Sequence, residues 1–421
     1  MKRLFTFCLL ACCTLQLLAQ GQTKHVLFVG NSYTEVNDLP MLVSQMAASM
    51  GDTLTYDSNT PGGCTFNQHC TNQSMNMIQQ GGWDVVVLQE QSQYPSFPQS
   101  QVEAEVFPYA AQLVQSVYMY SPCAEPMFFM TWGRQNGDQQ NAQFFPVLGT
   151  YEGMDSMLYE RYMYMASVND ASVCPVGRVW RVLRSEHPEI NLYSSDGSHP
   201  SMAGSYAAAC AFYTMIFRNS PLQSTYCSTL DENVASIIRS TVDSVVYQQL
   251  PMWQRPLPEA GFDTVCLDVT ENSVIYRFAN TSSYTDTYFW DFGDGETSNI
   301  MDPVHVYTES GTYTVTLVAT RHCMDDTVSL TMTVTLPTPP VDTTGISVAS
   351  TVTMKLYPNP AHDVLVVESE SSADAVIVDM VGRKMQTIKV VEGITPVDLR
   401  GLPRGRYFLL VDGHGMPFVI E

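Results

Sequence analysis

The chain has 421 residues, of which 45% are apolar, and its formal net charge is −22. The length predicts about two to four domains, and the apolar content is ample for globular cores, so a chain disordered throughout is excluded. The charge becomes −24 if Lys2 and Arg3 leave with the leader described below, because no acidic residue is lost with them. So acidic a surface repels phosphate and argues against nucleic-acid partners and anionic membranes.

The first twenty residues begin with a short basic patch and continue as an apolar stretch that ends near Ala19. This pattern predicts a secretory signal peptide over residues 1–20. The segment Leu9–Cys12 also resembles a lipoprotein-processing site, although the apolar run continues beyond it through Leu18. No later stretch approaches the roughly 20 apolar residues that cross a bilayer, so we expect no stable membrane span.

Residues 24–250 alternate short apolar runs with longer helix-compatible segments. Strands are predicted at Val26–Gly30, Leu54–Tyr56, Trp83–Gln89, Pro126–Trp132 and Val173–Val176, and helices at Leu39–Met50, Phe66–Gln80, Val102–Tyr120, Gly153–Ala166 and Ser201–Phe217. Strands that alternate with helices imply βαβ units and a parallel sheet covered on both faces. We therefore expect a three-layer α/β/α sandwich.

The composition changes at residues 251–261, where the run PMWQRPLP predicts a proline-rich linker. Residues 262–336 alternate apolar and polar positions, with Gly, Asp and Asn between the runs, and predict a small β-sandwich. A second proline-rich linker, residues 337–352, leads to a final β-rich segment over residues 353–421. The chain is thus expected to carry one α/β domain and two β modules.

Eight of the eleven cysteines follow the leader, which contains Cys8, Cys12 and Cys13. Their spacing shows no paired CxxC motif and no Cys/His cluster, so structural zinc is not indicated. In an oxidising compartment we expect disulfides instead. We favour Cys266 with Cys323, because both fall inside one β module, and regard Cys64 with Cys70 as a possible second pair.

The motif Gly30-Asn31-Ser32 follows the first predicted strand, at the edge of the sheet where ligands bind in α/β proteins. A serine hydroxyl is a poor nucleophile until a base lies beside it. Asp196 and His199 are three residues apart in a polar loop before the last predicted helix. This spacing is compatible with a catalytic triad of Ser32, Asp196 and His199, and equally with ordinary loop residues.

The blocks Gly30-Asn31-Ser32 and Asp196-Gly-Ser-His199, in this order, resemble the first and last blocks of the SGNH (GDSL-like) hydrolases, over residues 24–250. The chain looks most similar to a subgroup with GNS in place of GDS. The resemblance implies a flavodoxin-like three-layer fold, with Ser32 as nucleophile, His199 as general base and Asp196 as its partner. It implies no metal and no cofactor.

An acyl-transfer mechanism also needs hydrogen-bond donors for the oxyanion. The backbone N–H of Ser32 is one candidate, and Gly63 matches the family's second block, where the alternative is an ordinary turn. The family's third block, normally an Asn, is absent, and Leu88-Gln89-Glu90-Gln91-Ser92 stands in its place. A glutamine amide offers the same donor, as in similar esterases that act on sugar acetyl groups, which leaves the third donor open between Gln89 and Gln91.

Three further residues near this edge have no chemical role assigned by the pattern alone. We expect Asn31 and Glu90 to hold the loops by hydrogen bonds rather than to react. Trp132 follows another strand and is expected either to stack against a sugar ring or to cap the core. The histidines are scattered and lack the spacing of a zinc site.

The two β modules resemble known families of secreted proteins. The first module closely resembles a PKD domain in the motif Tyr288-Phe-Trp-Asp-Phe-Gly-Asp-Gly295. We expect Trp290 to be a core residue and Asp291, Gly293 and Asp294 to build a tight turn, with calcium or glycan contact as the alternative. Leu356-Tyr-Pro-Asn-Pro-Ala361 and the motifs after it resemble the carboxyl-terminal sorting domain of type IX secretion, which implies the secretion machinery as a partner and export across an outer membrane.

These features together predict a secreted or surface-attached serine esterase that removes acyl groups, most simply acetyl, from carbohydrate. A lipase or thioesterase acting on longer acyl chains is one alternative. A non-catalytic protein that binds glycans or mediates adhesion is another.

Overall fold

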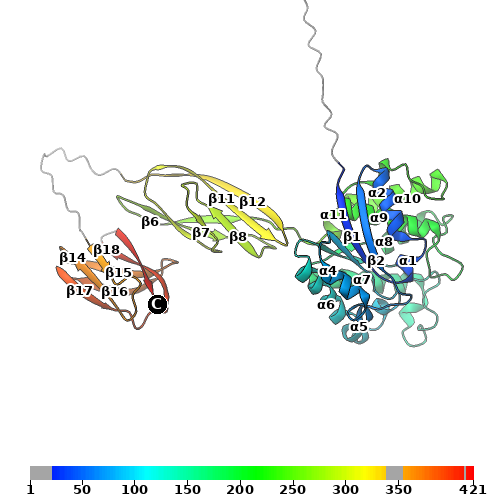
Figure 1. Ribbon diagram of the computed structural model, residues 1–421, viewed down its shortest axis with the longest axis horizontal. Helices are drawn as coiled ribbons and strands as arrows, with labels where there is room; N and C mark the ends of the chain where they lie inside the picture. The colour runs from blue at the N-terminus through cyan, green and yellow to red at the C-terminus, as the bar shows by residue number, and fades with distance from the viewer. Residues whose placement is uncertain (1–20, 338–353, 412–413) are drawn as a thin grey trace, which may run out of the picture. The chain divides into compact units, whose positions relative to one another are not determined.

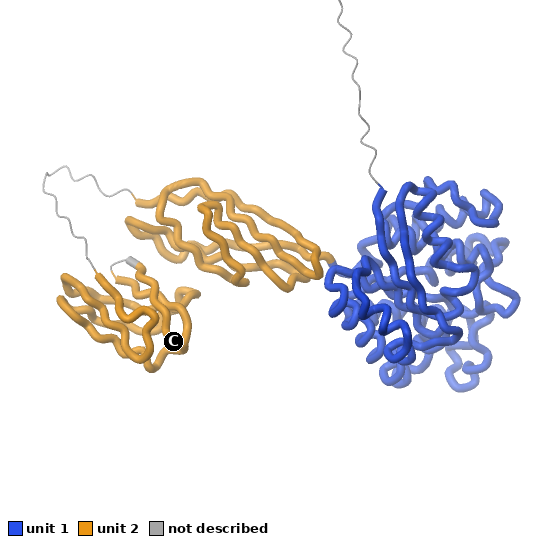
Figure 2. Tube along the Cα trace, in the orientation of Figure 1, with its two compact units in different colours: residues 1–256 blue, residues 257–421 orange. Residues whose placement is uncertain are grey.

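The computed structural model describes residues 21–337, 354–411 and 414–421. The chain divides into two compact units, residues 1–256 and 257–421 (Figures 1 and 2). The predicted signal peptide and all but the first residue of the predicted linker 337–352 lie outside the described residues. Across the described part of the chain, no helix combines the length and the apolar character that a bilayer crossing requires.

Unit 1 is built on a parallel sheet with the strand order β2-β1-β3-β4-β5. The strands are β1 (Thr23–Val29), β2 (Thr53–Asn59), β3 (Val85–Leu88), β4 (Glu125–Phe129) and β5 (Ser172–Cys174). Val26–Val29 and Val85–Leu88 are buried throughout, because these strands are covered on both faces. The five predicted strands are confirmed, and their order is that of flavodoxin-like sheets, in which ligands bind where the order reverses, between β1 and β3.

Helices cover both faces of this sheet (Figure 1). Helices α2, α8, α9 and α10 pack together in one layer and α3 to α7 in the other, which confirms the predicted three-layer sandwich. The helices are α1 (Ser32–Glu35), α2 (Leu39–Ser49), α3 (Phe66–His69), α4 (Gln73–Gln80), α5 (Gln99–Glu105), α6 (Phe107–Tyr120), α7 (Tyr151–Asn169), α8 (Val176–Glu186), α9 (Met202–Phe217), α10 (Glu232–Val245) and α11 (Leu250–Trp253).

The helices depart from the prediction in several places. Helices α1, α8, α10 and α11 were not expected. The helix predicted at 66–80 is divided into α3 and α4, because the side chain of Asn72 accepts a hydrogen bond from Ser74 N (2.7 Å) and begins a new helix. The helix predicted at 102–120 is divided near Pro108, which lies in the first turn of α6.

The predicted linker at 251–261 begins later than expected. Helix α11 extends to Trp253, whose side chain is buried, and Arg255 N donates to Ser172 Oγ (2.8 Å) on the edge strand β5. The first half of the proline-rich segment therefore packs on unit 1, and the division between the units falls after Pro256.

Unit 2 consists of antiparallel β-sheets, as expected. Its first part contains the sheets β10-β7-β6 and β12-β11-β8-β9, and its second part contains β13-β14-β17 and β16-β15-β18-β19. The strands are β6 (Phe262–Val269), β7 (Val274–Asn280), β8 (Thr287–Asp291), β9 (Thr297–Ser298), β10 (Val304–Tyr307), β11 (Gly311–Arg321), β12 (Met324–Val334), β13 (Met354–Tyr357), β14 (Val364–Ser369), β15 (Ala373–Asp379), β16 (Lys384–Val390), β17 (Gly393–Asp398), β18 (Gly405–Val411) and β19 (His414–Ile420).

The turn after β8 has the structure that its sequence suggests. Trp290 is fully buried in the core, as predicted. Asp291 Oδ1 accepts a hydrogen bond from Gly293 N (2.9 Å), and Asp294 Oδ1 accepts one from Glu296 N (3.0 Å). Asp294 also contacts His305 Nε2 (2.6 Å). These carboxylates therefore stabilise a tight turn, and a calcium role is not needed to explain them.

The predicted disulfides are wrong. Cys323 is disulfide-bonded, but Cys266 is an exposed free thiol. Cys64 and Cys70 are also free, and both are buried. Sharing one β module or one loop was therefore not enough to pair these cysteines, because a disulfide needs two Cβ atoms that face each other a few ångströms apart.

Candidate active site

Ser32 lies at the carboxyl end of β1, where the strand order of the sheet reverses. Gly30 leaves the strand at a crowded point, because a Cβ there would lie 2.6 Å from Thr34 Oγ1 and 2.8 Å from Gln89 Oε1. Asn31 then caps the short helix α1, accepting a hydrogen bond from Tyr33 N (3.2 Å). Ser32 is the first residue of that helix, so its hydroxyl stands at the edge of the sheet.

The structure brings Ser32, His199 and Asp196 into one hydrogen-bonded chain. Ser32 Oγ lies 2.9 Å from His199 Nε2, and His199 Nδ1 lies 2.5 Å from Asp196 Oδ2. When Nδ1–H donates to the carboxylate, Nε2 is left to accept the proton of the serine hydroxyl. This is the geometry that a serine nucleophile and its general base require.

The loop of residues 194–199 is closed by its own hydrogen bonds. Asp196 Oδ1 accepts from the backbone N–H groups of Ser198 (2.9 Å) and His199 (3.0 Å), and Ser194 N donates to His199 O (2.8 Å). Gly197 adopts a φ of +67°, which favours glycine. The aspartate thus fixes both the loop and the orientation of the imidazole.

Asp196 is held in its charged form. Partial burial acts to raise its pKa, but the hydrogen bonds from the His199 ring and from the backbone N–H groups of Ser198 and His199 outweigh burial and lower the pKa to about 2. The side chains of His199 and Asp196 are 35% and 48% exposed, so a substrate in solution can reach them. The carboxylate can therefore stabilise an imidazolium formed during a reaction.

Gln89 lies beside Ser32 but its amide is committed elsewhere. Its Oε1 accepts from Asn31 N (3.2 Å) and Thr34 Oγ1 (2.8 Å), which orients the amide. Its Nε2 donates to Asn31 Oδ1 (2.7 Å) and Glu90 O (2.9 Å), and the side chain is fully buried. Both amide hydrogens are therefore used, and the prediction of Gln89 as an oxyanion donor needs correction.

Asn31 joins three loops at the edge of the sheet. In addition to its contacts with Gln89, its Nδ2 donates to Cys64 O (3.1 Å) and Glu90 O (3.3 Å). The turn that contains Gly63 is thereby tied to the segment that carries Ser32. The hydrogen bonds that were expected to let Asn31 hold these loops are confirmed.

Three candidate donors remain at this edge. No acceptor among the described residues pairs with the backbone N–H of Ser32 or of Gly63. Gly63 is exposed, with a φ of +67° in the turn closed by the Cys64 N to Pro61 O hydrogen bond (3.1 Å). Gln91 Nε2 donates to Gln93 Oε1 (3.2 Å), which leaves it a second amide hydrogen. The oxyanion role of Ser32, Gly63 and Gln91 stays a prediction.

Glu90 is a fully buried carboxyl behind these loops. It accepts hydrogen bonds from Phe66 N (3.0 Å to each oxygen) and Gln91 N (2.6 Å), so it holds the two loops together as expected. Burial raises its pKa to about 8, although both backbone hydrogen bonds act in the opposite direction. The Glu90 carboxyl is therefore mostly protonated at neutral pH.

Trp132 does not present a face to a sugar. Its ring is fully buried and stacks on Trp180 (centroids 3.7 Å apart) and on Tyr33 (4.7 Å apart). Its Nε1 donates to Ser198 O (3.1 Å). The expectation of sugar stacking is therefore wrong, and Trp132 instead supports the loop that carries Asp196 and His199.

Tyr33 is a part of the site that was not predicted. Its hydroxyl lies 2.7 Å from Ser198 Oγ, and its ring meets the His199 ring edge-on with centroids 5.5 Å apart. Burial raises the pKa of Tyr33, so its hydroxyl stays neutral. The available signal was its position directly after Ser32, but an aromatic residue at that position is equally compatible with simple core packing.

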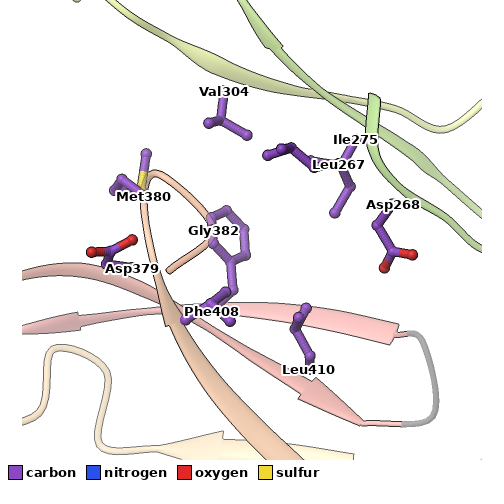
Figure 3. A pocket seen from close by; sticks show the side chains of 10 residues that line it. Leu267, Asp268, Ile275, Val304, Asp379, Met380, Gly382, Phe408 and Leu410 are labelled. Carbon is purple, nitrogen blue, oxygen red and sulfur yellow. The ribbon is translucent and has the colours of Figure 1, made fainter. Parts of the chain in front are cut away.

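The described residues offer no other site of comparable chemistry. They contain no group of three or more His, Cys, Asp or Glu side chains placed to hold a metal ion. A pocket in unit 2 is lined mainly by apolar side chains, among them Leu267, Ile275 and Leu410 (Figure 3). The residues of the predicted triad all belong to unit 1.

Comparison with solved structures finds similar proteins at low sequence identity. A DUF4886 family protein from Bacteroides uniformis is 16% identical with a TM-score of 0.47, over 53% of this chain and 94% of that chain. A putative SGNH hydrolase from Slackia heliotrinireducens is 23% identical with a TM-score of 0.38, over 45% and 97%. Est24, a carbohydrate acetylesterase from Sinorhizobium meliloti, is 17% identical with a TM-score of 0.34, over 46% and 98%. No curated protein matches the chain.

Family models match two stretches of the chain, the first of which begins just before the boundary between the units. Residues 253–336 match the PKD domain, and residues 355–417 match the secretion system C-terminal sorting domain. Both resemblances seen in the sequence are thereby confirmed, and the sorting domain indicates export across the outer membrane, to the cell surface or the medium. The chain is thus an exported protein with a three-layer α/β unit, followed by a PKD domain and a secretion system C-terminal sorting domain.

Proposed function

We propose that the protein is a secreted serine esterase that hydrolyses ester groups, most simply O-acetyl groups on carbohydrate. The observation that carries this proposal is the hydrogen-bonded chain from Ser32 Oγ through His199 to Asp196. The side chains of His199 and Asp196 are partly exposed, and the three residues lie at the edge of the parallel sheet where the strand order reverses.

In the proposed reaction, His199 Nε2 takes the proton of Ser32 Oγ while the oxygen attacks the ester carbonyl. The resulting oxyanion accepts hydrogen bonds from the backbone N–H groups of Ser32 and Gly63. His199 then gives the proton to the leaving alcohol, and an acyl-serine forms. Water, deprotonated by His199, releases the acid and restores the hydroxyl of Ser32.

Short acyl groups suit this site better than long ones. Each methylene of a long acyl chain contributes about 0.8 kcal/mol of binding free energy when it is buried. Burial of this kind requires an apolar groove beside the nucleophile. The hollow next to the 194–199 loop is of mixed character, because Gln135, Arg184 and Asn191 line it together with Pro188, Ile190, Leu192 and Tyr193. Export to the cell surface or the medium is compatible with a substrate outside the cell, such as a polysaccharide.

The test is hydrolysis of nitrophenyl esters of increasing acyl length and release of acetate from acetylated polysaccharides. Ser32→Ala should lower kcat at least about 10⁴-fold and abolish labelling by a fluorophosphonate probe. Ser58→Ala, which removes an exposed hydroxyl from β2, is the matched control and should retain full activity. Equal activity of wild type and Ser32→Ala would refute the assignment. Retention on polysaccharide without probe labelling of the wild type would favour a glycan-binding protein, and a preference for long chains would favour a lipase.

A further inference from the structure

A polar hollow adjoins the loop that carries Asp196 and His199. Its volume is about 390 Å³, it is open to solvent, and its walls include Gln135, Arg184, Pro188 and residues 190–193. Such a volume lies in the range of small-molecule sites, which are commonly about 300–1,000 Å³. The mechanism described above uses none of these residues.

The hollow is continuous with the catalytic loop. Residues 190–193 lead directly into the loop 194–199 along the chain. On the other wall, Gln135 N donates to Gly197 O (2.8 Å), and Tyr193 OH donates to Gly133 O (2.6 Å). A ligand in the hollow therefore contacts residues that are joined to the loop holding His199, at Tyr193 along the chain and at Gln135 through its hydrogen bond to Gly197.

Arg184 provides a fixed positive charge in this hollow. Its guanidinium carbon lies 4.0 Å from the centroid of the Tyr151 ring and 5.2 Å from that of Tyr193. Its Nη2 donates to Gln135 O (3.3 Å). Two aromatic rings and a carbonyl therefore hold the side chain in place before any ligand arrives.

This arginine differs from its neighbours on α8. Arg178 and Arg181 both pair with the buried carboxylate of Asp155, at 3.7 Å and 2.7 Å. No Asp or Glu in the described part of the chain forms an ion pair with Arg184, and the nearby Glu189 pairs with His187 (3.2 Å). The neutral partners of Arg184 leave its charge available to an anion.

We propose that this hollow binds the carboxylate of an acidic sugar residue next to the acylated residue, so that the substrate is an esterified acidic polysaccharide. This inference rests on the proposed esterase function. Arginine recognises a carboxylate through parallel N–H donors, and Gln135 and Asn191 supply further donors and acceptors for hydroxyl groups. The contact selects the substrate, whereas the bond-breaking steps stay with Ser32 and His199.

The first test compares kcat/KM for acetylated polygalacturonate with kcat/KM for acetylated glucomannan, which is neutral. Arg184→Gln should lower the ratio of acidic to neutral substrate about 10- to 100-fold, the loss expected when a charged hydrogen-bonding partner is removed. Gln135→Glu, which adds a carboxylate to the hollow without removing the arginine, should lower the same ratio. Arg178→Gln is the matched control, because it removes one charge from the same helix while Arg181 still pairs with Asp155. An unchanged ratio in both Arg184→Gln and Gln135→Glu would overturn the inference.

The second test measures binding without catalysis. Calorimetry with unacetylated oligogalacturonate and the Ser32→Ala full chain should give an affinity that falls about tenfold or more on adding Arg184→Gln. Equal affinities with and without that substitution would overturn the inference, even if the esterase activity is established. A Ser32-independent activity would refute the proposed function, whereas binding that depends on Arg184 would still support the anion site.

Discussion

The buried Glu90 carboxyl is expected to make the free energy of unfolding of unit 1 fall as the pH rises. Its pKa is 4.5 as an ordinary glutamate and about 8 in the fold, because burial disfavours the charged form. The folded state therefore holds the proton more tightly than the unfolded state does, and the stabilisation is complete below pH 4.5 and lost as the pH rises through 8. Since one pH unit corresponds to about 1.4 kcal/mol, the full effect is on the order of 5 kcal/mol.

Glu90→Gln is the perturbation that isolates this effect, because glutamine resembles the protonated carboxyl and cannot ionise. Its Oε1 can accept the hydrogen bonds that Phe66 N and Gln91 N now give to Glu90 Oε1. We expect the variant to match the wild type within about 1 kcal/mol near pH 4.5 and to be several kcal/mol more stable than the wild type at pH 8.5.

Urea unfolding of the full chain, followed by tryptophan fluorescence, measures this difference. Four of the five tryptophans, Trp83, Trp132, Trp180 and Trp253, belong to unit 1, so the signal reports mainly on the relevant unit. Glu186→Gln, at an exposed position on α8, is the control and should parallel the wild type from pH 5 to 8.5. A constant difference between Glu90→Gln and wild type over that range would refute the reasoning, as would a wild type that gains stability relative to the variant as pH rises.

Two further substitutions test how the site is held. Asp196→Asn should lower kcat about 10³- to 10⁴-fold with a much smaller change in KM, because an amide cannot stabilise the imidazolium. If the NH₂ group of the new asparagine turns toward His199 Nδ1, it also imposes the wrong tautomer on the imidazole. Steady-state kinetics with nitrophenyl acetate measure the effect, and a loss of kcat under tenfold would contradict the role of Asp196. Asn31→Ala should destabilise unit 1 by about 2–4 kcal/mol in urea unfolding, because it removes two hydrogen bonds to Cys64 O and Glu90 O and leaves one N–H of the buried Gln89 amide without an acceptor. A loss below about 1 kcal/mol would show that the loops do not depend on Asn31.

The parts of the fold that sequence predicted are those written in local patterns. Buried runs such as Val26–Val29 and Val85–Leu88 contain no polar residue and so identify central strands without knowledge of their neighbours. Asp196 and His199 share one short loop, so their contact depends on few dihedral angles. Helix boundaries depended on single residues, such as Asn72, whose capping role appears only when its side chain is seen to accept from Ser74 N.

The errors concern properties that depend on distant partners. Whether the Gln89 amide is free depends on Asn31 and Thr34, which lie more than 50 residues earlier in the chain. The faces of Trp132 are covered by Tyr33 and Trp180, about 100 and 50 residues away. A cysteine pairing likewise depends on which loops meet. In each case the residue type was compatible with the predicted role. Neighbouring residues, however, already bind or cover the group that the role requires, such as the amide of Gln89 or the ring faces of Trp132.

The loss of Gln89 as a donor changes how the proposed oxyanion site works. Gln89 Nε2 donates to the side-chain oxygen of Asn31, Gln89 Oε1 accepts from the backbone N–H of Asn31, and both residues are buried. Their four amide hydrogens are all used within the protein, on Asn31, Glu90 and Cys64. Stabilisation of an oxyanion must then come chiefly from backbone N–H groups, whose positions are fixed by the fold rather than by a rotamer. The Asn31 contact with Cys64 O ties the Gly63 turn to the segment that carries Ser32. In the proposed reaction, the role of the amide pair is therefore to place the oxyanion donors rather than to be one of them.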